Sequence, residues 1–288
     1  MPDPNGKGIY FVNGKSASVL IAYHVASKQA TEIVSEEVTV PSISPNRKRV
    51  MYSVNGRELW VSDIDGTNKV KLASGDDMST GQWANDNFHL TFFHNGVNAP
   101  AAAYIIGVDG SGLRELPRTE NMLYNLLWDQ DQRSIYLDGG DINSVSNVWK
   151  ISVDGSNREK IITDCGNVSD LDPSGKYLLS FVPYGARAGI YEVSIPDKKC
   201  VSLLPGIATG AFFSRDDKSF LYVVASRGES KFYSQSWDKG HTIGSPHTVL
   251  TVPFAFPLLN SLDVSRDLST IVFVRPGGHA ELYFQSQK

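Results

Sequence analysis

Short runs rich in apolar β-forming residues recur along the chain, separated by polar turns rich in Asp, Asn, Ser, Gly and Pro. The middle of the chain shows the order most clearly: Ser134 to Leu137, then Val148 to Ser152, an Asp154-Gly155 turn, and Glu159 to Ile162. Each run is short, as β-strands are, and no long window has the 3.6-residue period of a helix. Asp-Gly turns suit tight hairpins because both residues tolerate positive φ. The pattern therefore predicts an all-β chain built from hairpins.

One turn pattern, an apolar residue followed by Ser or Asp and a polar turn, repeats along the whole chain. Its seven copies are centred on Pro4, Pro45, Asn85, Gln130, Pro173, Arg215 and Arg266, at intervals of 41, 40, 45, 43, 42 and 51 residues. Four short antiparallel strands in a period of roughly 40 to 45 residues are typical of a β-propeller blade. We therefore predict one β-propeller domain over residues 1–288.

The seven turns predict seven blades of about four strands, with incomplete blades at the two ends, and about 26 strands in all. Six four-stranded blades are the alternative, but they would leave two strands without a place. The expected blades cover residues 1–37, 38–77, 78–121, 122–166, 167–208, 209–256 and 257–288. The first repeat has no inner strand before Asp3, which suggests a chain cut from a longer protein.

Two of these features resemble a known family: the Ser44-Pro45-Asn46-Arg47-Lys48 turn and the strand and hairpin from Leu59 to Gly66. They resemble the WD40-like (PD40) repeat of TolB-type β-propellers over essentially the whole chain. The arrangement is also similar to the propeller regions of bacterial eukaryote-like serine/threonine kinases. That second resemblance implies a sensor or docking module whose kinase domain, with its glycine-rich and catalytic loops, is absent from this sequence.

Composition and charge limit the kinds of partner that can be expected for this chain. Lys and Arg number 27 against 31 Asp and Glu, which gives a formal net charge of −4. No basic block resembles the phosphate-neutralising surface of a nucleic-acid-binding protein, and no apolar run reaches the roughly 20 residues of a membrane helix. The sequence therefore predicts neither a nucleic-acid partner nor a membrane span in this chain.

Binding residues are expected on the face that carries the variable loops, because variable loops on a rigid scaffold are where binding usually resides. These loops, together with polar residues of the inner strands, supply the candidate ligand-binding residues Arg57, His94, Tyr124, Asp170, Arg187, Arg227, Arg275 and His279. The alternative is that the loop charges are simply solvated and that the polar inner-strand residues satisfy backbone groups beside channel water.

Sequence motifs for catalysis are missing. The chain has no Gly-x-Ser-x-Gly elbow and no His-Glu-x-x-His, and its six histidines are scattered without paired spacing. We therefore expect no metal and no cofactor. Asp170 and Asp263 occupy equivalent inner-strand positions in different blades and are the one candidate carboxylate pair for sugar chemistry. Hydrogen bonding to neighbouring turns is the competing role for both.

Cys165 and Cys200 fall in neighbouring blades, at what the strand pattern makes opposite ends of outer strands. This separation predicts two free thiols, because a disulfide needs Cα atoms closer than about 7 Å. Free thiols fit a reducing compartment without proving one, so localisation stays open between the bacterial cytoplasm and, for a membrane-anchored parent, an extracytoplasmic site.

These observations favour a non-catalytic binding propeller that recognises a protein, a peptide or a small ligand on the variable-loop face, and that serves as the sensor of a larger kinase-like protein. The alternative is a carbohydrate-active enzyme, a glycosidase or lyase, with its site in the central channel.

Overall fold

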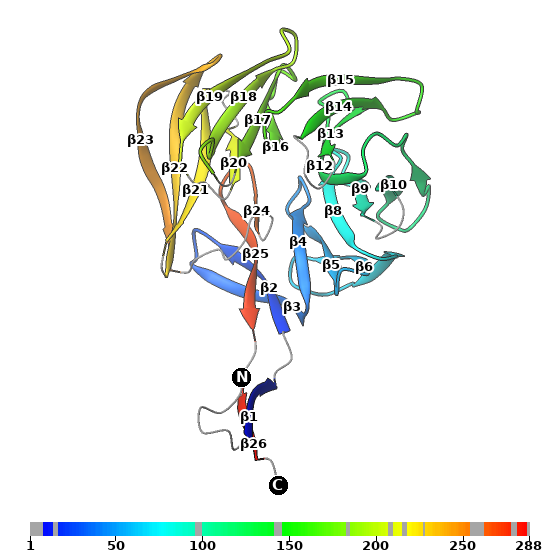
Figure 1. The fold of residues 1–288 in the computed structure, drawn as a ribbon, viewed down its shortest axis with the longest axis vertical. Helices are drawn as coiled ribbons and strands as arrows, with labels where there is room; N and C mark the ends of the chain where they lie inside the picture. The colour runs from blue at the N-terminus through cyan, green and yellow to red at the C-terminus, as the bar shows by residue number, and fades with distance from the viewer. Residues whose placement is uncertain are drawn as a thin grey trace.

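Six four-stranded antiparallel sheets surround a central channel in the computed structural model (Figure 1). The structure describes residues 8–13, 17–95, 100–140, 146–182, 185–206, 210–214, 218–226, 228–253, 262–277 and 281–286. Each sheet is one blade of a propeller, with its first strand beside the channel. The all-β propeller fold expected from the repeats is confirmed.

Five blades consist of four consecutive strands. Blade A contains β4 (Val38–Ile43), β5 (Arg49–Val54), β6 (Glu58–Asp63) and β7 (Val70–Ser74). Blade B contains β8 (Met78–Trp83), β9 (His89–His94), β10 (Ala102–Gly107) and β11 (Arg114–Glu115). Blade C contains β12 (Met122–Trp128), β13 (Ser134–Gly140), β14 (Asn147–Ser152) and β15 (Arg158–Thr163). Blade D contains β16 (Asn167–Leu171), β17 (Tyr177–Val182), β18 (Gly189–Ser194) and β19 (Lys199–Pro205). Blade E contains β20 (Gly210–Phe213), β21 (Ser219–Ser226), β22 (Glu229–Asp238) and β23 (His241–Val252).

The sixth blade, F, combines the two ends of the chain. Its inner strands β24 (Leu262–Val264) and β25 (Thr270–Gly277) come from the C-terminal part, and its outer strands β2 (Ala17–His24) and β3 (Gln29–Glu36) come from the N-terminal part. The pairing runs from Ala17 with Gly277 to His24 with Thr270. The seven-blade prediction is therefore wrong. The two end repeats would each expose unpaired strand edges, and pairing β2 with β25 satisfies those edges and closes the ring.

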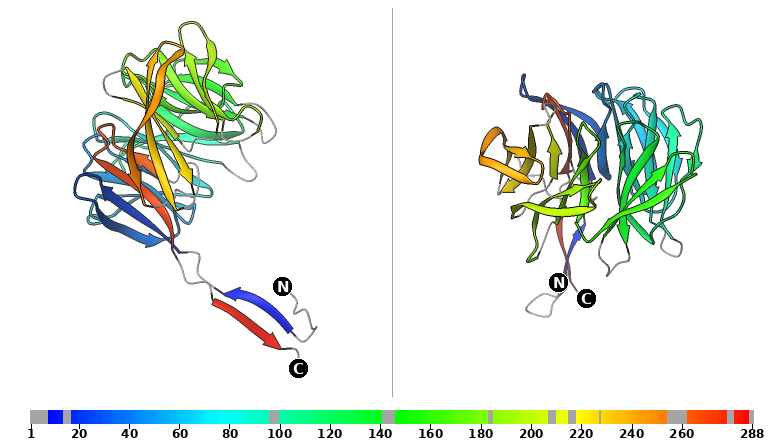
Figure 2. Two further views of the ribbon diagram at one scale, coloured as in Figure 1. Left: turned by 90° about the vertical axis from the view of Figure 1, so that its left-hand side faces the viewer. Right: turned by 90° about the horizontal axis from the view of Figure 1, so that it is seen from above.

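The two strands that six blades leave over form a ribbon of their own. β1 (Gly8–Asn13) pairs antiparallel with β26 (Glu281–Ser286), from Gly8 opposite Ser286 to Asn13 opposite Glu281. This ladder keeps the register of β2 with β25, with three residues of each strand between the two pairings. The ribbon projects away from the propeller and carries both ends of the chain (Figures 1 and 2). The missing inner strand of the first repeat is thus supplied by the C-terminal part of the chain.

The hydrophobic core is divided among the blade interfaces. The described residues contain six buried clusters, each built from the facing surfaces of two neighbouring blades. Trp83 lies between blades A and B, Trp128 between B and C, and Phe213 between D and E, all less than a tenth exposed. The indole Nε1 of Trp83 also donates to the carbonyl of Ser42 in the preceding blade, at 2.9 Å. These aromatic residues therefore act as wedges between neighbouring blades.

Cys165 and Cys200 form a disulfide with a Cα–Cα distance of 5.9 Å, so the prediction of two free thiols is wrong. Cys165 does not lie at the end of an outer strand. It lies in the connection from β15 to β16, fully buried, where its carbonyl accepts a hydrogen bond from Ser180 of β17. The connection thus places Cys165 against blade D, whose outer strand β19 carries Cys200. The argument from free thiols to a reducing compartment falls with the prediction.

No helix long and apolar enough to cross a bilayer occurs in the described parts of the chain.

Candidate functional site

A cavity of about 320 Å³ lies at the end of the channel where the inner strands meet their turns. All six blades contribute to its wall, with Arg47 from blade A, Asn85 from B, Gln130 from C, Asp170 from D and Phe212 from E. Blade F supplies Asp263 and the turn residues Ser265 to Asp267. A second cavity of about 120 Å³ continues along the channel between the inner strands. Ligand sites are typically concave, largely preformed and about 300 Å³ or more in volume, and the first of these two cavities reaches that size.

Side chains in three blades hold the next blade by its backbone. The inner strand of a blade is the edge of its sheet, so its outward N–H groups have no ladder partner. Asp170 accepts a hydrogen bond from the N–H of Phe213 at 2.9 Å, and Asp263 from the N–H of Ile43 at 2.7 Å. The amide oxygen of Gln82 accepts one from the N–H of Trp128 at 2.9 Å. These three clamps join blades D to E, F to A and B to C, and they account for the polar side chains at this depth of the channel.

β-Bulges lie at the positions of two of these side chains, Gln82 and Asp170. The pairing of β8 with β9 skips from Thr80 to Trp83, and that of β16 with β17 skips from Val168 to Asp170. A bulge leaves residues of one strand unpaired and re-aims the side chains beside it. Gln82 and Asp170 lie in or at the edge of these bulges, which is consistent with their contacts across the blade interface.

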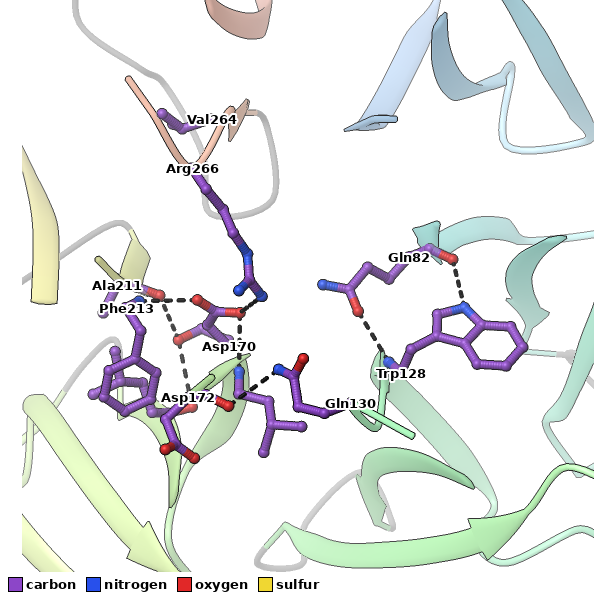
Figure 3. A network of polar contacts seen from close by, with 12 residues as sticks. Gln82, Trp128, Gln130, Asp170, Asp172, Ala211, Phe213, Val264 and Arg266 are labelled. Atoms are coloured by element: carbon purple, nitrogen blue, oxygen red, sulfur yellow. Dashed lines mark hydrogen bonds and ion pairs between the residues drawn. The ribbon is translucent and has the colours of Figure 1, made fainter. Parts of the chain in front are cut away.

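Arg266 reaches from the β24–β25 turn to blade D (Figure 3). Its Nη2 lies 3.2 Å from Oδ1 of Asp170, which also accepts the N–H of Leu171 at 2.9 Å. The Asp170 side chain is only 6% exposed, whereas that of Arg266 is 42% exposed. Gln130 of blade C lies beside these residues and donates to the carbonyl of Asp172 at 3.1 Å (Figure 3). The opening is thus framed by charged and amide groups.

Burial raises the pKa of both carboxyl groups. The pKa of Asp263 rises to about 6 because the group is desolvated, and the negative charge of Asp170 adds to the effect. Hydrogen bonds from Ile43 and Val264 and the positive charge of Arg266 offset only part of this. The pKa of Asp170 is raised for the same main reason, against the opposing influence of Arg266. Asp170 and Arg266 thus act in opposite directions on the pKa of Asp263.

The hydrogen bonds that the two carboxylates accept bear on whether Asp170 and Asp263 could act as the acid and base of an enzyme. Both oxygens of Asp263 accept backbone N–H groups, and those of Asp170 accept two backbone N–H groups and Arg266. This pattern fits the competing role of hydrogen bonding between repeats better than that of a free acid and base. Within the described residues, no group of three or more His, Cys, Asp or Glu side chains could hold a metal ion.

Of the eight residues predicted to bind a ligand, Asp170 alone lines either of these two cavities among those the structure describes. Arg57 is exposed in the β5–β6 turn, 4.0 Å from Asp76, and His94 stacks on Tyr104 at the end of β9. Arg187 pairs with Asp164 at 2.6 Å and lies over the ring of Tyr191.

Arg275 is exposed in β25, and Tyr124 is half-buried in β12. Arg227 and His279 lie outside the described residues. The variable-loop candidates therefore do not converge on the channel cavity, and their role in binding stays a prediction.

Residues missed from the sequence include Gln82, Gln130 and Arg266. Gln82, Asp170 and Asp263 each precede the apolar residue of the repeated turn, and Gln130 and Arg266 each follow it by two positions. Comparing these two positions across the repeats could have identified the three missed residues, because residues at one repeat position lie at one height in the channel.

Comparison with known proteins supports the fold alone. No family model and no curated protein matches the chain. Among solved structures, the chain is similar to a TolB candidate from Agrobacterium tumefaciens, with 15% identity, a TM-score of 0.68 and coverage of 91% of this chain and 98% of that one. The propeller domain of the trilobed protease from Pyrococcus furiosus, which has an open velcro topology, gives 13% identity, a TM-score of 0.60 and coverage of 98% and 94%.

A chain in the nidogen/laminin complex gives 10% identity, a TM-score of 0.58 and coverage of 89% and 98%. The TolB-like propeller architecture expected from the repeats is thus confirmed. None of these comparisons bears on a kinase-like parent.

Proposed function

We propose that this protein is a non-catalytic recognition propeller that binds a peptide or small ligand in the cavity at the turn end of its channel. The observation that carries the proposal is the cavity itself, which is lined from all six blades and has a volume of about 320 Å³. The cavity is formed by a rigid ring of blades, so binding a ligand there does not require a loop to become ordered. Trp128 and Phe212 supply apolar surface beside the polar groups of Gln130 and Arg266.

Two finer parts of the sequence interpretation stay predictions. A protein partner on the variable-loop face is compatible with ligand binding in the channel cavity, because the two sites lie at different ends of the strands. A place in a kinase-like parent rests on resemblance alone. An enzyme acting on carbohydrate has no specific observation in its favour, because the candidate carboxylates Asp170 and Asp263 hold backbone groups.

A substitution at the rim of the cavity tests this proposal. Asn85 is exposed in the β8–β9 turn and lines the cavity, so Asn85→Tyr should obstruct it while leaving the fold intact. In a thermal-shift screen of small amines, carboxylates, sugars and short peptides, a ligand at 100 times its Kd should raise the wild-type Tm by roughly 5 °C. Asn85→Tyr should abolish that shift.

The matched control is Asn157→Tyr, an exposed turn position on β14–β15 that does not line the cavity. It should respond to the ligand as the wild type does. A ligand whose stabilising effect survives Asn85→Tyr unchanged would place binding elsewhere on the ring.

A further inference from the structure

Among the described residues that line the cavity, negative charges outnumber positive ones. Its described lining contains Asp170, Asp263 and Asp267 but only Arg47 and Arg266, which leaves one negative charge in excess. Arg47 and Asp267 pair with each other at the rim. The remaining group is therefore two carboxylates that share one guanidinium.

Arg266 influences both carboxylates but forms an ion pair with only one of them. It pairs with Asp170 at 3.2 Å, whereas no lysine, arginine or histidine among the described residues forms an ion pair with Asp263. The oxygens of Asp263 accept the N–H groups of Ile43 and Val264, each at 2.7 Å. A carboxylate oxygen has a second acceptor site, so these bonds leave Asp263 able to accept from a ligand. Asp263 is also partly exposed.

An aromatic surface lies on the same wall. Phe212, from the blade between those that carry Asp170 and Asp263, lines both cavities and is partly exposed. The face of an aromatic ring attracts a cation within about 6 Å of its centroid. A carboxylate that forms no ion pair with any described residue and an aromatic ring together form the kind of surface that receives an ammonium or guanidinium group.

We propose that the cavity recognises a cationic group, an alkylammonium or guanidinium, with Asp263 as its counterion and Phe212 beside its carbon chain. The proposal rests on the proposed function, because it names the chemistry of the same cavity. A ligand cation would balance the excess negative charge of the described lining. An anionic ligand would have to compete with Asp170 for Arg266 and would lie close to a second carboxylate.

A matched set of small probes tests the charge preference. The probes are n-butylammonium, N-acetyl-lysine amide, butyramide and butyrate, titrated at equal ionic strength and pH 7.5 and followed by calorimetry. We expect the two ammonium probes to bind more tightly than butyramide, and butyrate not to bind. Tighter binding of N-acetyl-lysine amide than of n-butylammonium would identify a lysine side chain of a peptide as the source, and the reverse order a free amine.

Two substitutions should change the binding in opposite directions. Asp263→Asn should weaken ammonium binding by about tenfold, because it removes the counterion but keeps an acceptor for one backbone N–H. Arg266→Gln should strengthen it by about threefold, because it removes a competing positive charge. The opposite sign for Arg266→Gln keeps the test informative if Asp263→Asn folds poorly.

The pH dependence gives an independent arm. The described charged groups that line the cavity with Asp263 are Asp170 on β16, Arg266 and Asp267 in the β24–β25 turn, and Arg47 in the β4–β5 turn, and Asp170 and Arg266 act on its charge. With a pKa of about 6 in the free protein, Asp263 is ionised at pH 7.5 and mainly neutral at pH 5. Ammonium binding should therefore weaken by about tenfold between these pH values.

The failures of the two proposals differ. Preferential binding of butyrate that Arg266→Gln abolishes, or equal binding of butyramide and the ammonium probes, would overturn the cationic preference and leave the cavity as the site. Binding of the ammonium probes that Asn85→Tyr does not affect would overturn both. If none of the four probes binds while another ligand is lost on Asn85→Tyr, the cationic inference fails alone.

Discussion

Replacing Cys200 by Ser should lower the free energy of unfolding by about 4 kcal/mol, because the disulfide closes a loop with a sequence separation of 35 residues. Cys200 is the better position for the change, since it is partly exposed and Cys165 is fully buried. The loop runs from the start of blade D to its outer strand β19. The disulfide therefore restricts the conformations of this whole segment when the chain is unfolded. Denaturant unfolding of the oxidised wild type and of Cys200→Ser measures the difference.

The wild type under reducing conditions serves as the control, and its stability should fall close to that of Cys200→Ser. A thiol titration of the denatured, unreduced protein should find no free thiol. Two reactive thiols in that assay, or a wild-type stability that does not respond to reduction, would contradict the Cys165–Cys200 pairing.

Replacing Asp138 by Asn should remove much of the decline of stability with rising pH. Asp138 lies in β13, is fully buried, and has one hydrogen bond, a long one of 3.4 Å from Ser146 to Oδ2, among the described contacts. Within the described part of the chain, neither its Oδ1 nor the amide nitrogen of Asn125 has a hydrogen-bond partner. Burial raises the pKa of Asp138 to about 8, and the polar groups of Asn125, Ser146 and Val168 offset only part of that rise.

The sign follows from the two states. The folded protein keeps the Asp138 proton up to about pH 8, whereas the unfolded chain loses it near pH 4. The contribution to stability is therefore complete at low pH and is lost as pH rises toward 8, at about 1 kcal/mol per pH unit. The Asn side chain is neutral throughout, so Asp138→Asn should flatten this slope between pH 5 and 8.

Urea unfolding at pH 5, 6.5 and 8 compares the two proteins. Asp76→Asn, which changes an acid whose side chain is 82% exposed, is the matched control and should keep the wild-type slope. Parallel curves for the wild type and Asp138→Asn would mean that Asp138 is not held neutral by its burial.

The repeats made the blades predictable, but not the closure of the ring. The turn motif recurs with a regular period, so the inner strands and their hairpins could be placed from local pattern. The partner of β2 could not be placed in this way, because β25 lies some 250 residues away in the sequence and the pairing depends on the curvature of the whole ring. The prediction of about 26 strands agreed with the structure, and only their grouping into seven blades was wrong.

The site was predictable in part. The equivalent repeat positions identified Asp170 and Asp263 as inner-strand acids, and the structure places both in one cavity wall. Arg266 and Gln82 were missed because the sequence prediction placed the binding residues mainly in the variable loops at the other end of the strands. The disulfide was missed because the course of the connection at Cys165 across the blade face is a tertiary feature that strand pattern does not encode.

The central claim is that ligands are recognised in the channel cavity, and the five tryptophans offer a direct test of it. Trp83 and Trp128 line the cavity, whereas Trp60, Trp149 and Trp237 do not. Their indole N–H signals in a nitrogen-15 correlation spectrum can be assigned by single Trp→Phe changes. On titration with a ligand found by thermal shift, the signals of Trp83 and Trp128 should move with the binding curve while the other three stay in place. Shifts confined to Trp60, Trp149 or Trp237 would contradict the claim.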